Sequence, residues 1–151
     1  MTQSRSFPFT ADEFKHIYSQ VPRLTVEVVV MTTQGVILTW REESSWQNSW
    51  HIPGGTVYYQ ETLHDAVHRI AGEELGVEVE IEEQIGYIEY PSEEKERGFG
   101  WSVGIAFQCR LADEAELPNL LSDKLNTFFE LPSTIIEEQR AIIEKVLLQR
   151  K

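Results

Sequence analysis

The stretch Gly55-Thr-Val-Tyr-Tyr-Gln-Glu61, followed after seven residues by Arg69-Ile-Ala-Gly-Glu73-Glu74-Leu-Gly76-Val77, decides the fold of this sequence. Between its two parts, Thr62 has the side chain of a good helix N-cap. Gly76 lies where a left-handed residue commonly ends a helix. The sequence therefore predicts a central helix of roughly four turns over residues 63–75.

The charged residues of this helix are spaced for two different tasks. Arg69 and Glu73 are four positions apart, so they can pair on one helix face. Glu74 lies on an adjacent stripe, free to face the turn made by Pro53-Gly54-Gly55. Adjacent carboxylates near exposed backbone carbonyls provide hard oxygen ligands, which suit Mg²⁺ or Mn²⁺. Taken alone, Glu73 is more simply interpreted as part of a solvated helix face.

In register, the whole segment resembles the Nudix box. That motif runs Gly, five residues, Glu, seven residues, Arg-Glu, an apolar residue, any residue, Glu-Glu, any residue, Gly and an apolar residue. The chain departs from it only at Ile70, if Ala71 is counted as apolar. The resemblance implies an α/β (α+β) fold, with a mixed β-sheet sandwiched between helices and one domain over residues 1–151. It also implies a Mg²⁺-dependent hydrolase of a nucleoside diphosphate linked to another moiety.

The family pattern implies a role for each matching residue. Glu74 would be the principal metal ligand, beside the backbone carbonyl of Gly54, and Glu73 would be a second or water-bridged ligand. Glu61 and Arg69 would support the catalytic site by holding the loop and the helix in place. A buried charge pair suits that role because each partner offsets the desolvation of the other.

Ile70 is the informative departure, because the family commonly has a glutamate there that binds metal or acts as a general base. The GDP-mannose mannosyl hydrolases also carry an apolar residue at this position, and this chain is similar to them over about residues 7–111. In that branch one metal suffices, and water attacks the sugar carbon instead of phosphorus. The resemblance implies a GDP-mannose-like nucleotide sugar as substrate. The alternative is a catalytically impaired Nudix domain that acts as a nucleotide-binding sensor module.

The general base stays unassigned. The mannosyl hydrolase branch has a histidine just ahead of its later strand, where this chain has Gly100-Trp101-Ser102. His51 lies next to the glycine turn, but nothing else in the sequence favours it as the general base. Glu93, Glu94 and Glu96 lie in a predicted loop of suitable position, although a solvated charge run is the favoured interpretation of that loop.

Two residues are candidates for contact with substrate. Arg41 ends a predicted strand, and its planar guanidinium suits a phosphate, although a surface arginine explains it equally well. Trp46 lies in a polar loop, where an indole ring could stack on a nucleobase.

The remaining elements follow from capping signals, turns and periodicity. We expect a helix from the capping box Thr10–Glu13 to about Gln20 and a last helix that starts near Ser133 with Thr134 and Glu137 at capping-box spacing. We expect strands at residues 24–32, 36–41, 50–52, 77–81, 85–90 and 99–111, a charged loop at 92–98 and a long loop after 111.

Composition limits the partners. The 151 residues carry a formal net charge of −12, which disfavours binding to nucleic acid or to an acidic membrane surface. A small nucleotide remains compatible if a cation offsets the charge. The single Cys109 and the absence of a signal-like start indicate a cytoplasmic setting. The apolar arm Phe7-Pro8-Phe9 is compatible with a homodimer, but contacts within one chain explain it equally well.

Overall fold

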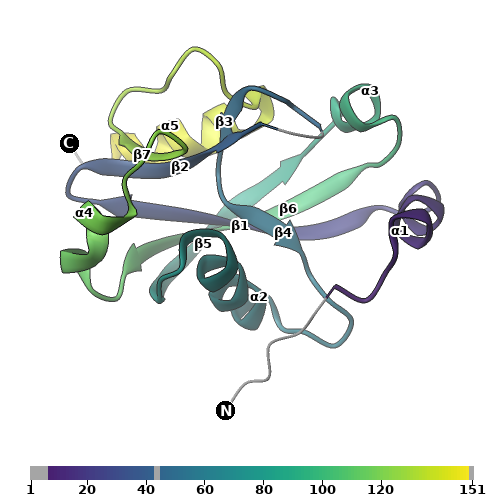
Figure 1. The fold of residues 1–151 in the computed structure, drawn as a ribbon, viewed down its shortest axis with the longest axis horizontal. Coiled ribbons are helices and arrows are strands. Elements are labelled where there is room, and N and C mark those ends of the chain that lie inside the picture. Colours follow the sequence, from purple (N-terminus) through teal and green to yellow (C-terminus); the bar gives the residue numbers. More distant parts are fainter. Residues whose placement is uncertain (1–6, 43–44, 150–151) are drawn as a thin grey trace.

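A central strand with two buried faces organises the structure, a computed structural model that describes residues 7–42 and 45–149 (Figure 1). Those residues contain a seven-stranded mixed sheet with the path β3-β2-β1-β6-β5, while β4 pairs with β1 and β7 pairs with β2. The strands are β1 (Arg23–Thr32), β2 (Gly35–Arg41), β3 (Ser49–His51), β4 (Gly54–Thr56), β5 (Val79–Glu89), β6 (Ser102–Leu111) and β7 (Leu125–Phe128).

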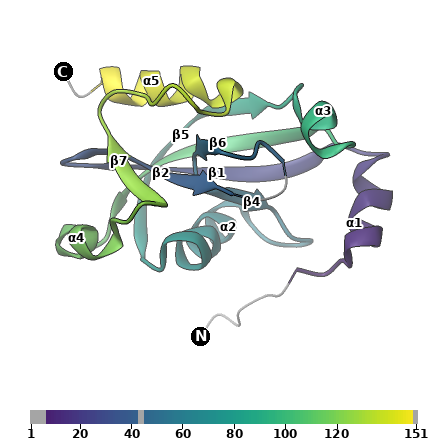
Figure 2. The ribbon, with the colours of Figure 1, turned by 45° about the horizontal axis from the view of Figure 1, so that its top comes forward.

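Helices cover both faces of the sheet, with α2 and α5 on opposite sides in Figure 2. The α-helices are α1 (Ala11–Tyr18), α2 (Leu63–Ile70), α3 (Glu93–Arg97), α4 (Leu117–Leu120) and α5 (Arg140–Leu148), with short 3-10 turns at Glu114–Glu116 and Glu137–Gln139. The predicted mixed sheet between helices is confirmed. In the described part of the chain, no helix has both the length and the apolarity that a membrane crossing requires.

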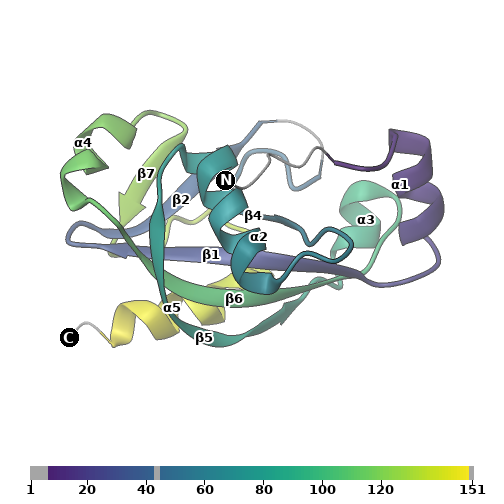
Figure 3. The same cartoon turned by 90° about the horizontal axis from the view of Figure 1, so that it is seen from below.

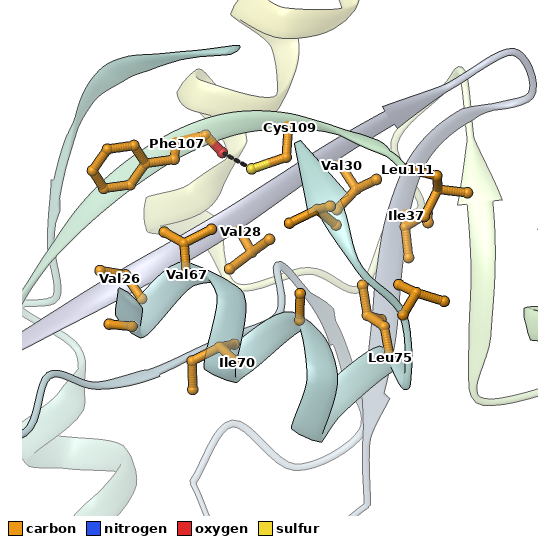
Figure 4. Close-up of a cluster of buried hydrophobic side chains, with 14 of the residues drawn as sticks. Val26, Val28, Val30, Ile37, Val67, Ile70, Leu75, Phe107, Cys109 and Leu111 are labelled. Atoms are coloured by element: carbon orange, nitrogen blue, oxygen red, sulfur yellow. Dashed lines mark hydrogen bonds between the residues drawn. The ribbon is translucent and has the colours of Figure 1, made fainter. Parts of the chain in front are cut away.

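Two apolar clusters flank β1 because neighbouring side chains of a strand point to opposite faces. Val26, Val28 and Val30 pack with α2 in the first cluster, which Figure 4 shows. Val29 packs with the residues of α5 in the second. The valine-rich run is therefore that of a strand buried on both faces.

Strand pairing brings distant parts of the chain to one end of β1. The strand pairs in parallel with β6 from Arg23 to Val30 and antiparallel with β4, where Glu27 lies opposite Gly54. Figure 3 shows α2 lying across these strands. The glycine turn that precedes α2 is thus held directly against β1.

The predicted central helix is present, but its last turn differs. Thr62 caps α2 by accepting a hydrogen bond from the backbone of Asp65 at 3.1 Å, and Gly76 is left-handed with φ 69°. Between them, residues Ala71–Leu75 form a π-helical turn. Such turns are frequent at functional sites, and this one carries Glu73 and Glu74.

The predicted loop at residues 92–98 is wrong, because most of it forms the short helix α3. Glu93 is buried there, so the segment is not a run of solvated charges. Its carboxylate lies 3.4 Å from Arg23 and 3.1 Å from Arg97. These two guanidinium groups offset the cost of burying the charge.

The predicted start of the last helix at Ser133 is also wrong. Thr134 and Ile136 instead flank Trp50 of β3, since the Trp50 amide donates to the Thr134 carbonyl at 2.9 Å and the Ile136 amide donates to the Trp50 carbonyl at 3.2 Å. These bonds keep the backbone extended. A 3-10 turn then leads into α5 at Arg140.

Two further segments are more ordered than expected. The long loop after β6 contains a 3-10 turn, α4 and β7, and β7 covers the edge of β2 from Val36 to Thr39. The two predicted strands at 77–81 and 85–90 form the single strand β5, with register irregularities after Ile81 and Gln84.

The amino-terminal arm makes its contacts within the chain. The ring of Phe7 lies 5.7 Å from that of Phe9 and 5.6 Å from those of Phe14 and Tyr58. The capping box of Thr10 that starts α1 is present as predicted. The arm therefore gives the expected homodimer no separate support.

Candidate active site at the glycine turn

The turn before α2 needs glycine at two positions because side chains already occupy the space beside it. A Cβ on Gly54 would collide with the carboxylate of Glu27 and would lie 2.7 Å from the carbonyl oxygen of Val26. A Cβ on Gly55 would lie 2.5 Å from Cδ1 of Ile70. The turn is thus closely packed between β1 and α2.

Arg69 and Glu61 form a nearly buried ion pair that ties this turn to α2. Arg69 Nε donates to Glu61 Oε2 at 2.8 Å and Nη2 donates to Oε1 at 3.0 Å. Nη2 also donates to the Thr56 carbonyl at 2.8 Å, and the guanidinium lies 3.7 Å from the centre of the Tyr58 ring. The side chains are only 11% and 3% exposed. This geometry agrees with the supporting role expected of both residues.

Glu73 and Glu74 lie at the outer side of this network. Arg69 Nη1 donates to Glu73 at 3.2 Å, as their spacing predicts. Glu74 is exposed to solvent, yet partial desolvation and the nearby charge of Glu73 raise its pKa, while Arg41 opposes that rise. Arg41 therefore links Glu74 electrostatically to the cavity described below.

These groups fit a cation that takes few protein ligands. Within residues 7–42 and 45–149, no cluster of three or more histidine, cysteine, aspartate or glutamate side chains could hold a metal ion. Ile70 is buried and adds no oxygen ligand. The adjacent exposed carboxylates of Glu73 and Glu74 could offer a hard cation such as Mg²⁺ a few oxygen ligands, since this ion commonly retains water and substrate oxygens as its other ligands.

A cavity of about 170 Å³ opens beside the glycine turn. Gly54 and Gly55 form part of its wall, and Ile52 and Ile136 contribute apolar surface. The charged and hydrogen-bonding residues in its wall include Arg23, Glu27, Arg41, Tyr90, Arg97 and Gln139. In a protein with a net charge of −12, a cavity with three arginines is suited to an anionic ligand.

Glu27 is a candidate functional residue that the sequence analysis missed. It is only 5% exposed, and it accepts hydrogen bonds from Tyr90 Oη at 2.9 Å and Thr25 Oγ1 at 3.1 Å. Gln139 Nε2 in turn donates to Tyr90 Oη at 2.9 Å. Desolvation raises the pKa of Glu27 to about 7. A single glutamate inside a valine-rich strand was the sequence signal that could have identified it.

The earlier base candidates are less well placed. Desolvation lowers the pKa of His51 to about 4, and its ring nitrogens contact the Ile52 carbonyl and the Thr39 hydroxyl. Glu93 is buried between two arginines, and Glu96 accepts a hydrogen bond from the backbone of Trp46 at 3.3 Å. The structure thus favours none of them as a base.

Arg41 and Trp46, the predicted substrate contacts, both line the cavity. The guanidinium of Arg41 lies 5.9 Å from the centre of the Trp46 ring, and its Nε donates to the Ser45 carbonyl at 2.8 Å. Trp46 Nε1 donates to Ser92 Oγ at 2.9 Å, and its ring lies 5.7 Å from that of Tyr90. Both side chains are thereby oriented, and their contact with substrate stays a prediction.

The comparison with known families agrees with this geometry. The NUDIX domain family model matches residues 21–141, which include the sheet, the glycine turn and α2. This chain belongs to the NUDIX family. The expected Nudix-type hydrolase is thereby confirmed.

Relatives and solved structures add detail. The "low-salt glycan biosynthesis protein Agl8" of Haloferax volcanii is 44% identical over 79 residues, which are 52% of this chain and 51% of that protein. This chain therefore matches about half the length of that relative. The MutT NUDIX hydrolase from Burkholderia pseudomallei superimposes with a TM-score of 0.67 at 20% identity, covering 83% of this chain and 98% of its own. The MutT protein from Methanosarcina mazei superimposes with a TM-score of 0.64 at 18% identity, covering 86% of this chain and 96% of its own.

Proposed function

We propose that this NUDIX protein is a Mg²⁺-dependent hydrolase, with Mn²⁺ as an alternative cation, that acts on a nucleoside diphosphate linked to a sugar. The observation that carries the proposal is the cavity beside Gly54 and Gly55, whose wall contains three arginines, in a chain that carries the adjacent carboxylates of Glu73 and Glu74 on the turn that ends the following helix. The name of the Haloferax relative mentions glycan biosynthesis, which supports a sugar as the attached group.

Each residue then has a defined task. Glu74, the Gly54 carbonyl and Glu73 would hold the cation. A bound divalent cation would supply stabilisation of the charge that develops on the diphosphate during displacement. Arg41 would bind a phosphate oxygen and Trp46 would stack on the base.

The other polar residues orient the reactants. Glu61 and Arg69 keep the turn and α2 in fixed relation through their buried pair. The Glu27 carboxylate, held by Tyr90, is an acceptor in the cavity wall for a substrate hydroxyl or for water.

A substrate panel tests the function directly. Purified protein would be incubated with nucleotide sugars, other nucleoside diphosphate derivatives and free nucleotides, with Mg²⁺, with Mn²⁺ or with EDTA. We expect metal-dependent release of a nucleotide product from at least one nucleotide sugar. Saturable nucleotide binding without turnover under all of these conditions would instead identify a sensor module.

Isotope labelling would show whether water attacks the sugar carbon or phosphorus. Because Ile70 replaces a carboxylate and the branch with that replacement attacks carbon, we expect ¹⁸O from labelled water to enter the released sugar. Mass spectrometry of both products would measure this. Label in a phosphate product would show attack at phosphorus.

We expect Glu74→Gln to raise the Mg²⁺ concentration needed for half-maximal activity by about 10–100-fold, because a neutral amide binds a hard cation less strongly than a carboxylate does. Metal titration of the initial rate would measure it. Glu78→Gln, which removes an exposed carboxylate after the helix, is the matched control and should leave the titration unchanged. An unchanged titration in Glu74→Gln would remove this residue from the metal site.

A further inference from the structure

Arg97 lines the cavity with hydrogen-bond donors that none of the described residues accepts from. It is the last residue of α3, its side chain is 21% exposed, and it lines the cavity. Its Nε lies 3.1 Å from Glu93 Oε2, and its guanidinium lies 5.7 Å from the centre of the Phe14 ring. Among the described residues, none accepts a hydrogen bond from its two terminal nitrogens. The buried donor of this guanidinium is Nε, whereas the two terminal nitrogens are accessible and can donate to a ligand or to water.

Arg23, the neighbouring arginine, donates from each of its three nitrogens to another residue of the protein. Its Nε donates to Ser102 at 3.0 Å, its Nη1 to Thr56 at 2.9 Å and its Nη2 to Glu93 at 3.4 Å. Glu93 therefore contacts Arg23 and Arg97 through the same carboxylate oxygen. Arg23 and Glu93 act as positioning residues, and Arg97 is the member of this cluster whose two terminal nitrogens donate to none of the described residues.

Three arginines, Arg23, Arg41 and Arg97, share the cavity wall with the glycine turn. Arg41 is the cation that acts on Glu74, and it also acts on Arg97. The pKa of Arg97 is lowered by desolvation first and then by the charges of Arg23 and Arg41, against the opposing effect of Glu93. Gly54 and Gly55 line the cavity beside β1, whereas Arg97 lines it from the end of α3, where its guanidinium lies beside Phe14. A diphosphate bound at the glycine turn and Arg41 would leave the α3 side of the cavity, with Arg97, for the next part of its substrate.

We infer that Arg97 binds an anionic group that the substrate carries beyond its diphosphate, an inference that rests on the proposed function for the position of the diphosphate. A neutral hydroxyl could accept hydrogen bonds, but it would not reduce the repulsion among three guanidinium groups. A carboxylate or a phosphate does both, and it matches the two parallel donors of an arginine. The carboxylate of an acidic sugar and the terminal phosphate of a nucleoside triphosphate share this chemistry.

Matched ligand pairs test the inference and separate the two sources. Calorimetry would compare UDP-glucuronate with UDP-glucose, GDP-mannuronate with GDP-mannose, and UTP and GTP with UDP and GDP, each with EDTA and with Mg²⁺. We expect the acidic member of one class of pair to bind about tenfold or more tightly, because a charged hydrogen bond contributes roughly 1.5–3 kcal/mol. A preference confined to the sugars identifies a carboxylate, and one confined to the triphosphates identifies a phosphate.

Variants then assign that preference to Arg97. In Arg97→Gln, the acidic and neutral ligands of a pair should bind with nearly equal affinity. Arg97→Lys retains the charge but loses the paired donors, so it should keep a preference smaller than that of the wild type. Arg110→Gln removes an exposed arginine that pairs with Glu80 and should retain the full preference. Circular dichroism and thermal unfolding would establish that each variant is folded.

Equal binding of acidic and neutral members by the wild type, no binding of any member, or a preference that persists in Arg97→Gln would overturn the inference. An Arg97-dependent preference without turnover would support it while rejecting the proposed hydrolysis. Turnover of neutral nucleotide sugars with no preference for acidic ones would support the hydrolysis and reject this inference alone.

Discussion

Replacing Arg69 with methionine should lower the free energy of unfolding by about 3–5 kcal/mol, the range for removing one partner of a buried ion pair. The substitution leaves the Glu61 carboxylate, whose side chain is only 3% exposed, without its two strong donors. It also removes the hydrogen bond to the Thr56 carbonyl. Chemical denaturation would measure the loss, which corresponds to a fall in Tm of roughly 10 °C for a chain of this size.

Two further variants separate the buried charge from the loss of packing. Glu61→Leu combined with Arg69→Met removes both charges and should recover a large part of the loss, because no unpaired carboxylate remains buried. Arg110→Met breaks an exposed ion pair with Glu80 and should leave the stability nearly unchanged. A loss in Arg69→Met no greater than in Arg110→Met would show that the Arg69 pair does not hold the turn.

Local spacing made part of this site predictable. Arg69 and Glu73 share one helix, so their pairing followed from a separation of four residues. The glycine turn and Gly76 were predictable because few other residues tolerate such close packing or a left-handed backbone. A π-helical last turn could not be read from the same pattern, because it depends on how the helix end packs.

The missed residues depend on contacts between distant segments. Glu27 becomes part of the site only because β1 pairs with β4 and places it opposite Gly54. Arg97 reaches the cavity because Glu93 is buried between two arginines, one of them at the start of β1. In the sequence, residues 92–98 look like any solvated charge run. Long-range strand pairing placed Glu27 and long-range ion pairing placed Arg97, and local sequence patterns specify neither.

Replacing Glu27 with glutamine should stabilise the metal-free protein at pH 8. Desolvation raises the pKa of this carboxyl from 4.5 to about 7, so the folded protein prefers its protonated form. The contribution of Glu27 to the free energy of unfolding is therefore fully present below pH 4.5, where the carboxyl is protonated in both states, and it is lost as the pH rises through 7. Glutamine stays neutral throughout. The gain of Glu27→Gln over wild type should therefore grow between pH 4.5 and 8 to about 3 kcal/mol at most.

Denaturation in EDTA at several pH values would measure this difference, with Glu89→Gln as an exposed carboxylate control on β5. A gain that does not grow with pH would show that Glu27 is not held as a desolvated acid. Glutamine can still accept the hydrogen bond from Tyr90, so a stabilised variant that has lost hydrolysis would separate function from folding. If removing the carboxylate of Glu27 stabilises the protein and abolishes activity, its role is in function, through contact with substrate or water, and not in folding.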